Sequence, residues 1–345
     1  MVAATMWGIH NDTLGAELLE KGFISIGWDE IPDLRTVGEG RERLKELVRR
    51  TYPNAKAGAI PVWTGVMHRF AFEMKVGDSV IAPYKPDGTL NFGVIDGPYY
   101  HTEDAPLHKH RRQVRWVRTG VARGLFPQAA LYEIGSAVTL FQVRKHADIF
   151  RQFLQTPSEE TFEQSTRDYK RPTEETARLV EEEVNADRIE QHTRDFIVRV
   201  LRNELSDEEF EHFVADLLRA MGYQARVTPF SADGGVDVIA HKDPLGLEPP
   251  LIKVQCKHTT STRGRPDVQQ LIGTLSAGEV GLFVTLGTFS KDAVDLERER
   301  QSLRLFGGTD VTRLTLEHYH HLPHRWRERL PLRSLLVVDR APESQ

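Results

Sequence analysis

The segment Leu251-Ile-Lys-Val-Gln-Cys-Lys257 predicts a β-strand in which polar and apolar side chains alternate towards its end. Successive side chains of a strand point to opposite faces of a sheet. Gln255 and Lys257 therefore share one face, and Cys256 points the other way, into the core. A strand of this kind predicts a sheet with one face that packs against the protein and one polar edge that is free for chemistry.

A second β-type run, Val236-Asp-Val-Ile-Ala240, directly follows a pair of glycines. Its three apolar side chains face the core, so Asp237 faces outward. If the two strands pair, Asp237, Gln255 and Lys257 converge on one side of the sheet edge. The carboxylate, the Gln255 side-chain carbonyl and the main-chain carbonyl of Cys256 are the oxygen ligands that Mg²⁺ (or Mn²⁺) prefers. Such an ion polarises a scissile phosphate, and Lys257 offsets the charge that develops on it.

The neighbouring sequence predicts the rest of an α/β domain with a central mixed sheet. Ser206 and Glu209 form a capping box before a helix that runs over residues 210–221 and stops at Gly222. Further β-type runs lie at 224–229 and 281–286, and further helices at about 266–278 and 291–303. Helices that alternate with strands in this way are typical of an α/β layer architecture.

Residues 206–322 resemble the Mrr-type catalytic domain of the PD-(D/E)xK restriction-endonuclease superfamily, in its QxK variant. The resemblance rests on the helix Phe210 to Tyr223, the segment Ser231-Ala-Asp-Gly-Gly-Val-Asp237, the strand Val254-Gln-Cys-Lys257 and Phe283-Val-Thr285. It implies a restriction-endonuclease-like fold, with Asp237 as a metal ligand and Gln255 and Lys257 completing the site. It also places Glu211 near the site, as an auxiliary ligand or orienting group or simply as an exposed carboxylate. Asp233 is expected to be a turn residue.

The whole chain has 345 residues, a net charge of −5 and a single cysteine, Cys256. These values predict two or three globular domains, a DNA-binding surface that is local, and neither an internal disulfide nor a cysteine-rich zinc site. The absence of a long apolar run and of a secretory signal predicts a cytoplasmic protein with no membrane partner. We expect domains at 1–150 and 196–345, joined by a charged helical linker over 151–195. Within the linker, residues 173–190 hold seven acids and two bases.

The first domain is expected to be an α+β barrel. Short β-type runs lie at 78–82, 90–95 and 113–117, separated by turn residues, and an amphipathic helix lies at 40–50. The run from Lys75 to Tyr84 and the strand His110-Arg-Arg-Gln-Val-Arg-Trp116 resemble, more loosely, the EVE branch of the PUA-like fold. Domains of that kind hold a flipped, modified base between aromatic side chains. The resemblance makes these aromatic residues candidate walls of a base pocket: Trp7, Trp28, Trp63, Tyr84 and Trp116. Aromatic residues of this kind also fill small barrel cores.

Basic residues mark the surfaces that we expect to meet phosphates. In the first domain these are Lys109, Arg111, Arg112, Arg115 and Arg118, and beside the cutting site they are Arg263 and Arg265. His318 and His321 also have spacing compatible with a metal site, but at the end of a helix they are more often ordinary surface or core side chains.

The sequence thus predicts a modification-dependent restriction endonuclease that binds double-stranded DNA. One such domain holds one strand-cutting site, so a double-strand break implies a homodimer or two bound copies. Two alternatives stay open at this point. One is a phage-defence nuclease gated by a nucleotide ligand on the first domain, and the other is a repair nuclease that recognises DNA structure.

Overall fold

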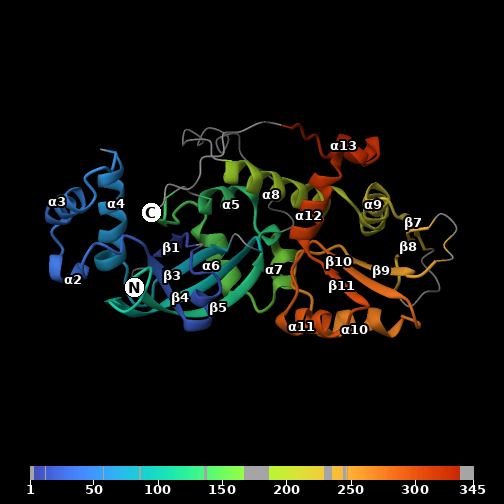
Figure 1. The fold of residues 1–345 in the computed structure, drawn as a ribbon, viewed down its shortest axis with the longest axis horizontal. Helices are drawn as coiled ribbons and strands as arrows, with labels where there is room; N and C mark the ends of the chain where they lie inside the picture. Colours follow the sequence, from blue (N-terminus) through green and yellow to red (C-terminus); the bar gives the residue numbers. More distant parts are fainter. Residues whose placement is uncertain are drawn as a thin grey trace. The chain divides into compact units, whose positions relative to one another are not determined.

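The structure is a computed structural model that describes residues 4–11, 13–56, 58–84, 87–135, 138–166, 186–228, 235–243, 246 and 248–334. The chain divides into two compact units (Figure 1). The first comprises the residues up to Gly120 together with Ala129–Gln155, and the second comprises Val121–Gln128 together with the residues from Thr156. The expected turn residue Asp233 and most of the acidic run at 173–190 lie outside the described residues.

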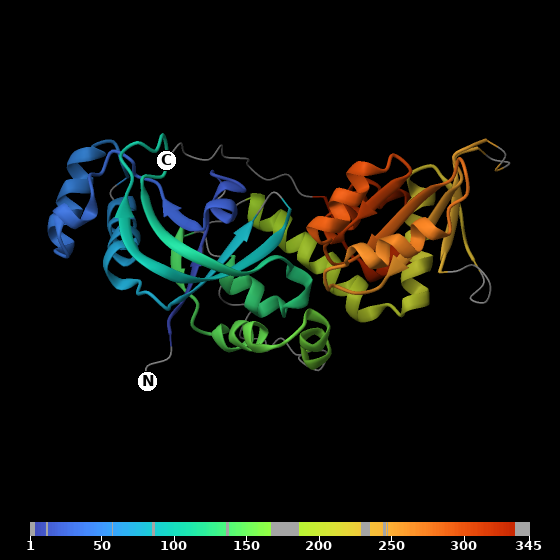
Figure 2. The ribbon, with the colours of Figure 1, turned by 90° about the horizontal axis from the view of Figure 1, so that it is seen from below.

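A six-stranded sheet forms the centre of the first unit, in the order β2-β5-β4-β3-β1-β6. The strands are β1 (Met6–Ile9), β2 (Phe23–Ile26), β3 (Ser79–Tyr84), β4 (Thr89–His101), β5 (His110–Ala122) and β6 (Leu140–Gln142). β1 pairs parallel with β3 and antiparallel with β6. Figure 2 shows β4 and β5 as long, bent ribbons. Because β2 and β6 are the two edges, the described strands form an open half-barrel, and the expected PUA/EVE-like barrel is not confirmed.

The three β-type runs and the amphipathic helix expected in this unit are present, as β3, β4, β5 and α3, and the strands are longer than expected. The helices are α1 (Glu17–Lys21), α2 (Leu34–Val37), α3 (Arg41–Thr51), α4 (Ala59–His68), the π-helix η1 (Arg69–Glu73), α5 (Gln128–Ile134) and α6 (Ala147–Gln155). Sequence reasoning missed α4, since it carries Pro61 and Gly65. Packing explains this helix, because it buries Val66 and Met67 in the core of the unit.

A five-stranded mixed sheet forms the second unit, in the order β11-β10-β9-β8-β7. The strands are β7 (Gln224–Val227), β8 (Val238–His241), β9 (Ile252–Lys257), β10 (Val280–Thr285) and β11 (Leu303–Phe306). β9, β10 and β11 run parallel, whereas β8 runs antiparallel to both β9 and β7. The expected mixed sheet is therefore confirmed, with β9 at its centre.

Helices cover both faces of this sheet (Figure 1). The helices of this unit are α7 (Glu159–Thr166), α8 (Ala186–Glu204), α9 (Asp207–Ala220), α10 (Arg265–Gly273), α11 (Lys291–Glu299), α12 (Gly308–Glu317) and α13 (His324–Arg329), with short 3₁₀ turns η2 (Arg123–Leu125) and η4 (Tyr319–His321). The capping box expected at Ser206 and Glu209 is present at the start of α9. α8, α9, α12 and α13 pack on one face, and α10 and α11 on the other. Among the described residues, no helix is both long and apolar enough to span a membrane.

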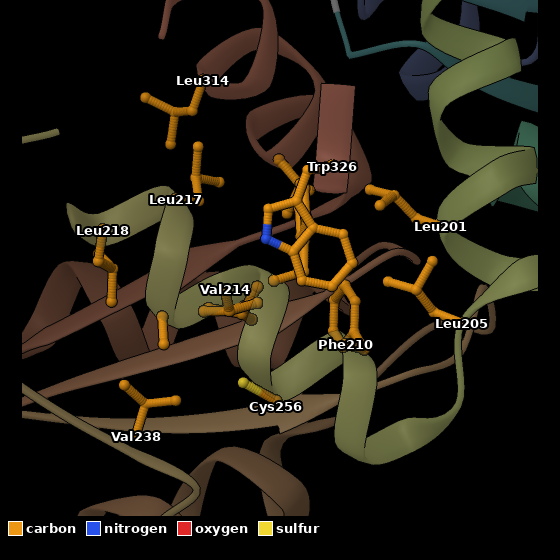
Figure 3. Packing of buried hydrophobic residues seen from close by; sticks show 14 of the residues in the cluster. Leu201, Leu205, Phe210, Val214, Leu217, Leu218, Val238, Cys256, Leu314 and Trp326 are labelled. Carbon is orange, nitrogen blue, oxygen red and sulfur yellow. The ribbon is translucent and has the colours of Figure 1, made fainter. Parts of the chain in front are cut away.

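The core on the α9 face fixes which side of β9 is available to the site. Val238 and Cys256 point from the sheet towards α9, beneath Val214, Phe210 and Trp326 (Figure 3). Cys256 is only 9% exposed, so the expectation that it points into the core is confirmed. The side chains that alternate with Val238 and Cys256 along β8 and β9 must then point to the opposite face of the sheet.

Candidate active site

The pairing of β8 with β9 sets the position of Asp237. Val238 pairs with Val254, and the next residue back, Asp237, donates its N–H to the Val254 carbonyl at 2.8 Å. The Asp237 side chain turns along the edge, where its Oδ2 accepts the main-chain N–H of Cys256 at 2.6 Å. Burial raises the pKa of the Asp237 carboxyl, while the Cys256 N–H and the charge of Lys257 act in the opposite direction. The carboxylate is thus tied to the centre of the sheet.

Gln255 lies on the face of β9 opposite to Cys256 and is only 3% exposed. Its register partner on β10 is Phe283, which belongs to the core beneath α10 and α11. The Gln255 Oε1 atom is buried, and it accepts no hydrogen bond from any described residue. A buried carbonyl oxygen without a partner costs about 1–3 kcal/mol and calls for an explanation. A cation at this oxygen would provide one.

Gly235 lets the loop before β8 come close to the Gln255 amide. Its φ is +93°, and a Cβ built at this position would lie 3.1 Å from Gln255 Nε2. Only glycine accepts both the left-handed backbone and the close approach without strain. The glycine that precedes the Val236–Ala240 run therefore has a physical role beside the site.

Glu211 on α9 belongs to the same cluster of charges. Burial, together with repulsion from Asp237 and two acids in the first turn of α9, raises its pKa to about 7, while Lys257 acts in the opposite direction. Both carboxylates and Lys257 also influence the buried Cys256 thiol, whose pKa is raised chiefly by burial. Asp237, Glu211 and Lys257 therefore interact electrostatically with one another around the end of β9. A carboxyl with a pKa near neutrality is a feature of functional sites.

The donor set fits a hard divalent cation. Two carboxylates (Asp237 and Glu211), the orphaned amide oxygen of Gln255 and the Cys256 carbonyl are all oxygen donors, as Mg²⁺ requires. The described residues contain no group of three or more His, Cys, Asp and Glu side chains that could hold a metal, so a soft, nitrogen- or sulfur-rich site is not found in them. His318 and His321, whose ring centroids are 6.5 Å apart, do not form such a group either.

The basic loop that follows β9 contacts acidic side chains of α7. Arg263 forms an ion pair with Glu160 at 3.0 Å and its side chain is only 16% exposed, so its expected contact with phosphates stays a prediction. Glu163 accepts hydrogen bonds from Thr260 and from Arg202, which join the same loop to α7 and α8. Arg265 is more exposed and lies 4.0 Å from Glu299, so its contact with DNA stays a prediction.

Two predicted surface and pocket residues of the first unit are buried instead. Arg112 is 3% exposed, and its guanidinium donates to the carbonyls of Phe70, Ala71 and Gly97, so it cannot reach a phosphate. Trp7 is 1% exposed and donates its Nε1–H to Asp78, which makes it a core residue and not a pocket wall. Arg112 lies on the buried side of β5, and β1, which carries Trp7, is buried along its whole length.

The other predicted residues of this unit keep some access to solvent, with one exception. Arg115 is exposed, and Lys109, Arg111 and Arg118 are half-buried. Trp116 and Tyr84 are also half-buried, and Trp116 donates its Nε1–H to the Leu18 carbonyl. The exception is Trp28, which is 5% exposed and contacts the half-buried Trp63 with ring centroids 6.0 Å apart.

Sequence reasoning missed a group of arginines in the first unit, namely Arg41, Arg69 and Arg144. They come from three separate segments and line one hollow. No spacing in the sequence connects them, so only the fold brings them together.

Comparison with known proteins agrees with the geometry of the second unit. Residues 202–315 match the Mrr-type family described as "Restriction endonuclease". The chain therefore carries a restriction-endonuclease domain, which implies a DNA endonuclease. Residues 5–130 match a family described as "Domain of unknown function (DUF8426)". No curated protein matches the sequence.

Several solved structures are similar to this chain at low identity. The DNA modification-dependent restriction endonuclease AspBHI is 14% identical over 78% of this chain and 70% of its own, with a TM-score of 0.33. The MspJI restriction endonuclease in complex with a 27-mer oligonucleotide is 15% identical over 97% of this chain and 73% of its own, with a TM-score of 0.32. The protein of unknown function AF1548 is 18% identical, with a TM-score of 0.25. This match covers 30% of the present chain and 58% of AF1548.

The raised pKa of Glu211 predicts how stability depends on pH. A carboxyl whose pKa rises from 4.5 to about 7 on folding gives stability that is complete below about pH 4.5 and is lost as the pH rises through 7. The Glu211→Gln variant lacks this loss, so its stability relative to the wild type should rise between pH 5 and pH 8, by about 1 kcal/mol once solvent screening of this partly exposed group is allowed for. Urea unfolding in EDTA measures the difference.

The exposed Glu204, at the end of α8, provides the matched control. Glu204→Gln should leave the pH dependence of stability unchanged. If Glu211→Gln and the wild type lost stability in parallel above pH 5, the electrostatic coupling of Glu211 to the site would be wrong.

Proposed function

We propose that this protein is a modification-dependent restriction endonuclease that hydrolyses DNA phosphodiester bonds with Mg²⁺ or Mn²⁺. The observation that carries the proposal is the buried Gln255 Oε1, which has no hydrogen-bond partner among the described residues and belongs to the same site as two carboxylates and Lys257. Asp237, Glu211, Gln255 and the Cys256 carbonyl would hold the ion. A bound divalent cation would supply Lewis-acid polarisation of the scissile phosphate.

The side chains of the chain itself account for the other requirements of the reaction. Lys257 places a positive charge next to both carboxylates, where it offsets the negative charge that builds up on the phosphate. Glu211, with a pKa of about 7, is able to take up a proton at its carboxylate close to neutral pH. Asp237 is held by the Cys256 N–H, so its orientation does not depend on the substrate.

Recognition of a modified, flipped base is the proposed role of the first unit. The support comes from a group of aromatic side chains in which Trp63 contacts both Trp28 and Tyr52, the latter edge-on at 5.6 Å. Trp28 has a φ of +67°, a conformation that costs energy in a bulky residue and that concentrates at functional sites. Asp29, the next residue, accepts the main-chain N–H of Lys109, which brings a basic residue beside the aromatic group.

The partner in this proposal is double-stranded DNA, and two copies of the chain are needed for a double-strand break. Each chain supplies one set of Asp237, Gln255 and Lys257, which suffices for one strand. A homodimer, or two molecules on one DNA site, therefore accounts for cleavage of both strands.

Cleavage of plasmid DNA tests the nuclease proposal. We expect cutting in Mg²⁺ or Mn²⁺ and none in EDTA. Asp237→Ala, Gln255→Leu and Lys257→Ala should each reduce the rate at least about a hundredfold, since each removes a group that acts on the charge of the transition state. DNA binding, measured by a shift assay, should change little because none of the three belongs to the exposed basic residues.

Lys253→Ala is the matched control for these variants. Lys253 lies on the same strand and face as Lys257, but its ammonium group pairs with Glu279 at 2.8 Å. Its loss should leave the cutting rate within about threefold of the wild type. Full activity of the Asp237→Ala variant, or full activity in EDTA, would contradict the proposed site.

Duplexes that differ in a single base modification test the reader proposal. The full chain carrying Asp237→Ala should bind a duplex with 5-methylcytosine, its hydroxymethyl or glucosylated form, or N6-methyladenine more tightly than the unmodified duplex. Trp63→Leu should remove this preference, because a flipped base needs stacking to offset an unstacking cost of a few kcal/mol. Arg115→Gln should weaken binding to both duplexes alike. Equal affinity for every modified and unmodified duplex would refute the reader role.

A further inference from the structure

An open hollow of about 420 Å³ lies in the first unit, between the start of α3, the π-helix η1 and the edge strand β6. None of its residues belongs to the proposed cutting site or to the aromatic group around Trp63. Its polar lining comes from three arginines, a glutamate and a glutamine, and its apolar lining from three side chains. The residues are Arg41, Arg69, Glu73, Val138, Leu140, Phe141, Gln142 and Arg144.

The charge of this hollow is not balanced. Three guanidinium groups face one carboxylate, and that carboxylate, on Glu73, already contacts His68 Nδ1 at 3.0 Å. Burial lowers the pKa of Arg69; Glu73 offsets this in part, and the charges of Arg41 and Arg144 lower the pKa further. Among the described residues, none of the three arginines forms an ion pair within 4.0 Å. Cations gathered in this way, without a counter-ion, favour an anionic ligand.

The hydrogen-bonding capacity of these arginines is also largely unused. A guanidinium carries five N–H donors. Arg69 Nε is buried without a partner, and its Nη2 makes only a long contact, 3.4 Å, to the Leu140 carbonyl. Arg41 makes no side-chain hydrogen bond to any described residue, and the Arg144 guanidinium donates only to the Gln142 side-chain oxygen. An oxyanion with several acceptor atoms would satisfy these donors together.

Backbone features hold Arg41 and Arg69 in place. A Cβ at the buried Gly65 of α4 would lie 3.3 Å from Arg41 Nη2 and 3.7 Å from Arg69 Nη1, so glycine makes room for both guanidinium groups over one turn of helix. The buried Arg112 stabilises the π-helix that carries Arg69, because it donates to the Phe70 and Ala71 carbonyls. π-helical turns of this kind often occur at functional sites.

An aromatic surface completes the hollow. A Cβ at Gly8 of β1 would lie only 2.2 Å from the ring of Phe141, so this ring packs directly on the β1 backbone. Phe141 stays half-buried and lines the hollow beside the buried Leu140 and the Gln142 amide. A fixed ring next to a polar amide suits a heteroaromatic base, which stacks and also forms hydrogen bonds.

We propose that this hollow binds a free nucleotide, with its phosphate on Arg41, Arg69 and Arg144 and its base against Phe141. A phosphate monoester has three terminal acceptor oxygens and a charge near −2, which matches three guanidinium forks better than a carboxylate does. A volume of about 420 Å³ lies within the range of small-ligand pockets and far below what a duplex needs. The proposal assigns a ligand site to the first unit and does not depend on the nuclease proposal.

Calorimetric titration of the 345-residue chain in EDTA tests the site without any contribution from cleavage. The probes are the four 5′-deoxynucleoside monophosphates, deoxyadenosine, inorganic phosphate, acetate and an unmodified duplex. At least one monophosphate should bind 10-fold or more tightly than deoxyadenosine, roughly the effect of losing charge-assisted hydrogen bonds. Inorganic phosphate should compete with it, and acetate should not.

Two exposed arginines of the hollow allow the site to be changed without risk to the fold. Arg41→Gln and Arg144→Gln should each weaken monophosphate binding about 10-fold, and Arg41→Lys should restore part of the loss because it keeps the charge without the fork. Arg49→Gln, on the same helix as Arg41 but paired with Glu46, is the matched control and should bind as the wild type does.

Three results would overturn the proposal. They are failure of every monophosphate to bind at millimolar concentration, equal binding of the monophosphates and deoxyadenosine, and binding that Arg41→Gln and Arg144→Gln leave unchanged. If the two substitutions weakened binding of the duplex alone, Arg41 and Arg144 would be contacts to the DNA backbone. This result would likewise refute a free-nucleotide site.

Discussion

The second unit depends on the antiparallel pairing of β8 with β9. This pairing places Asp237 opposite the end of the central strand, where the Cys256 N–H holds its carboxylate at 2.6 Å. The same alternation that buries Val238 and Cys256 beneath α9 leaves Gln255 and Lys257 on the other face. A shift of the pairing by one residue would exchange the two faces and bring Asp237 into the apolar core. The core and the site are therefore specified by one register.

Two polar groups of the site lie in unfavourable surroundings. Gln255 Oε1 is buried without a hydrogen bond, and Glu211 is held close to Asp237, which raises its pKa to about 7. Both features cost stability in the free protein. Asp216, another buried polar residue of the second unit, accepts hydrogen bonds from Trp326, Arg219 and Arg325. Local departures of this kind are expected where a ligand completes the structure.

The sequence predicted the features that local patterns control. Alternation along β9 placed Gln255 and Lys257 on one face, and the capping box at Ser206 located the start of α9. Prediction from sequence failed where the position of a side chain depends on contacts between distant segments. Arg111 and Arg112 are adjacent in a basic run, yet Arg112 points inward and donates to the Phe70 and Ala71 carbonyls of η1. The ion pair of Arg263 with Glu160 is likewise absent from local patterns, because Glu160 lies about a hundred residues away.

The same limit explains why the arginine-lined hollow could not be foreseen. Arg41, Arg69 and Arg144 come from α3, η1 and the chain after β6, and the glycines that make room for them, or for the ring beside them, lie on α4 and β1. Glycine and arginine are common residues, so no single one of them points to a ligand. The barrel expected of an EVE-like domain likewise depends on how the edge strands pair, which local sequence does not determine.

Anomalous diffraction from crystals soaked in Mn²⁺ tests the central claim most directly, since it locates the ion without reference to cleavage. The proposed site predicts an anomalous peak within about 2.5 Å of both an Asp237 carboxylate oxygen and Gln255 Oε1, with Glu211 at or next to the ion. Occupied Mn²⁺ sites elsewhere in the chain, with no peak between Asp237 and Gln255, would contradict it.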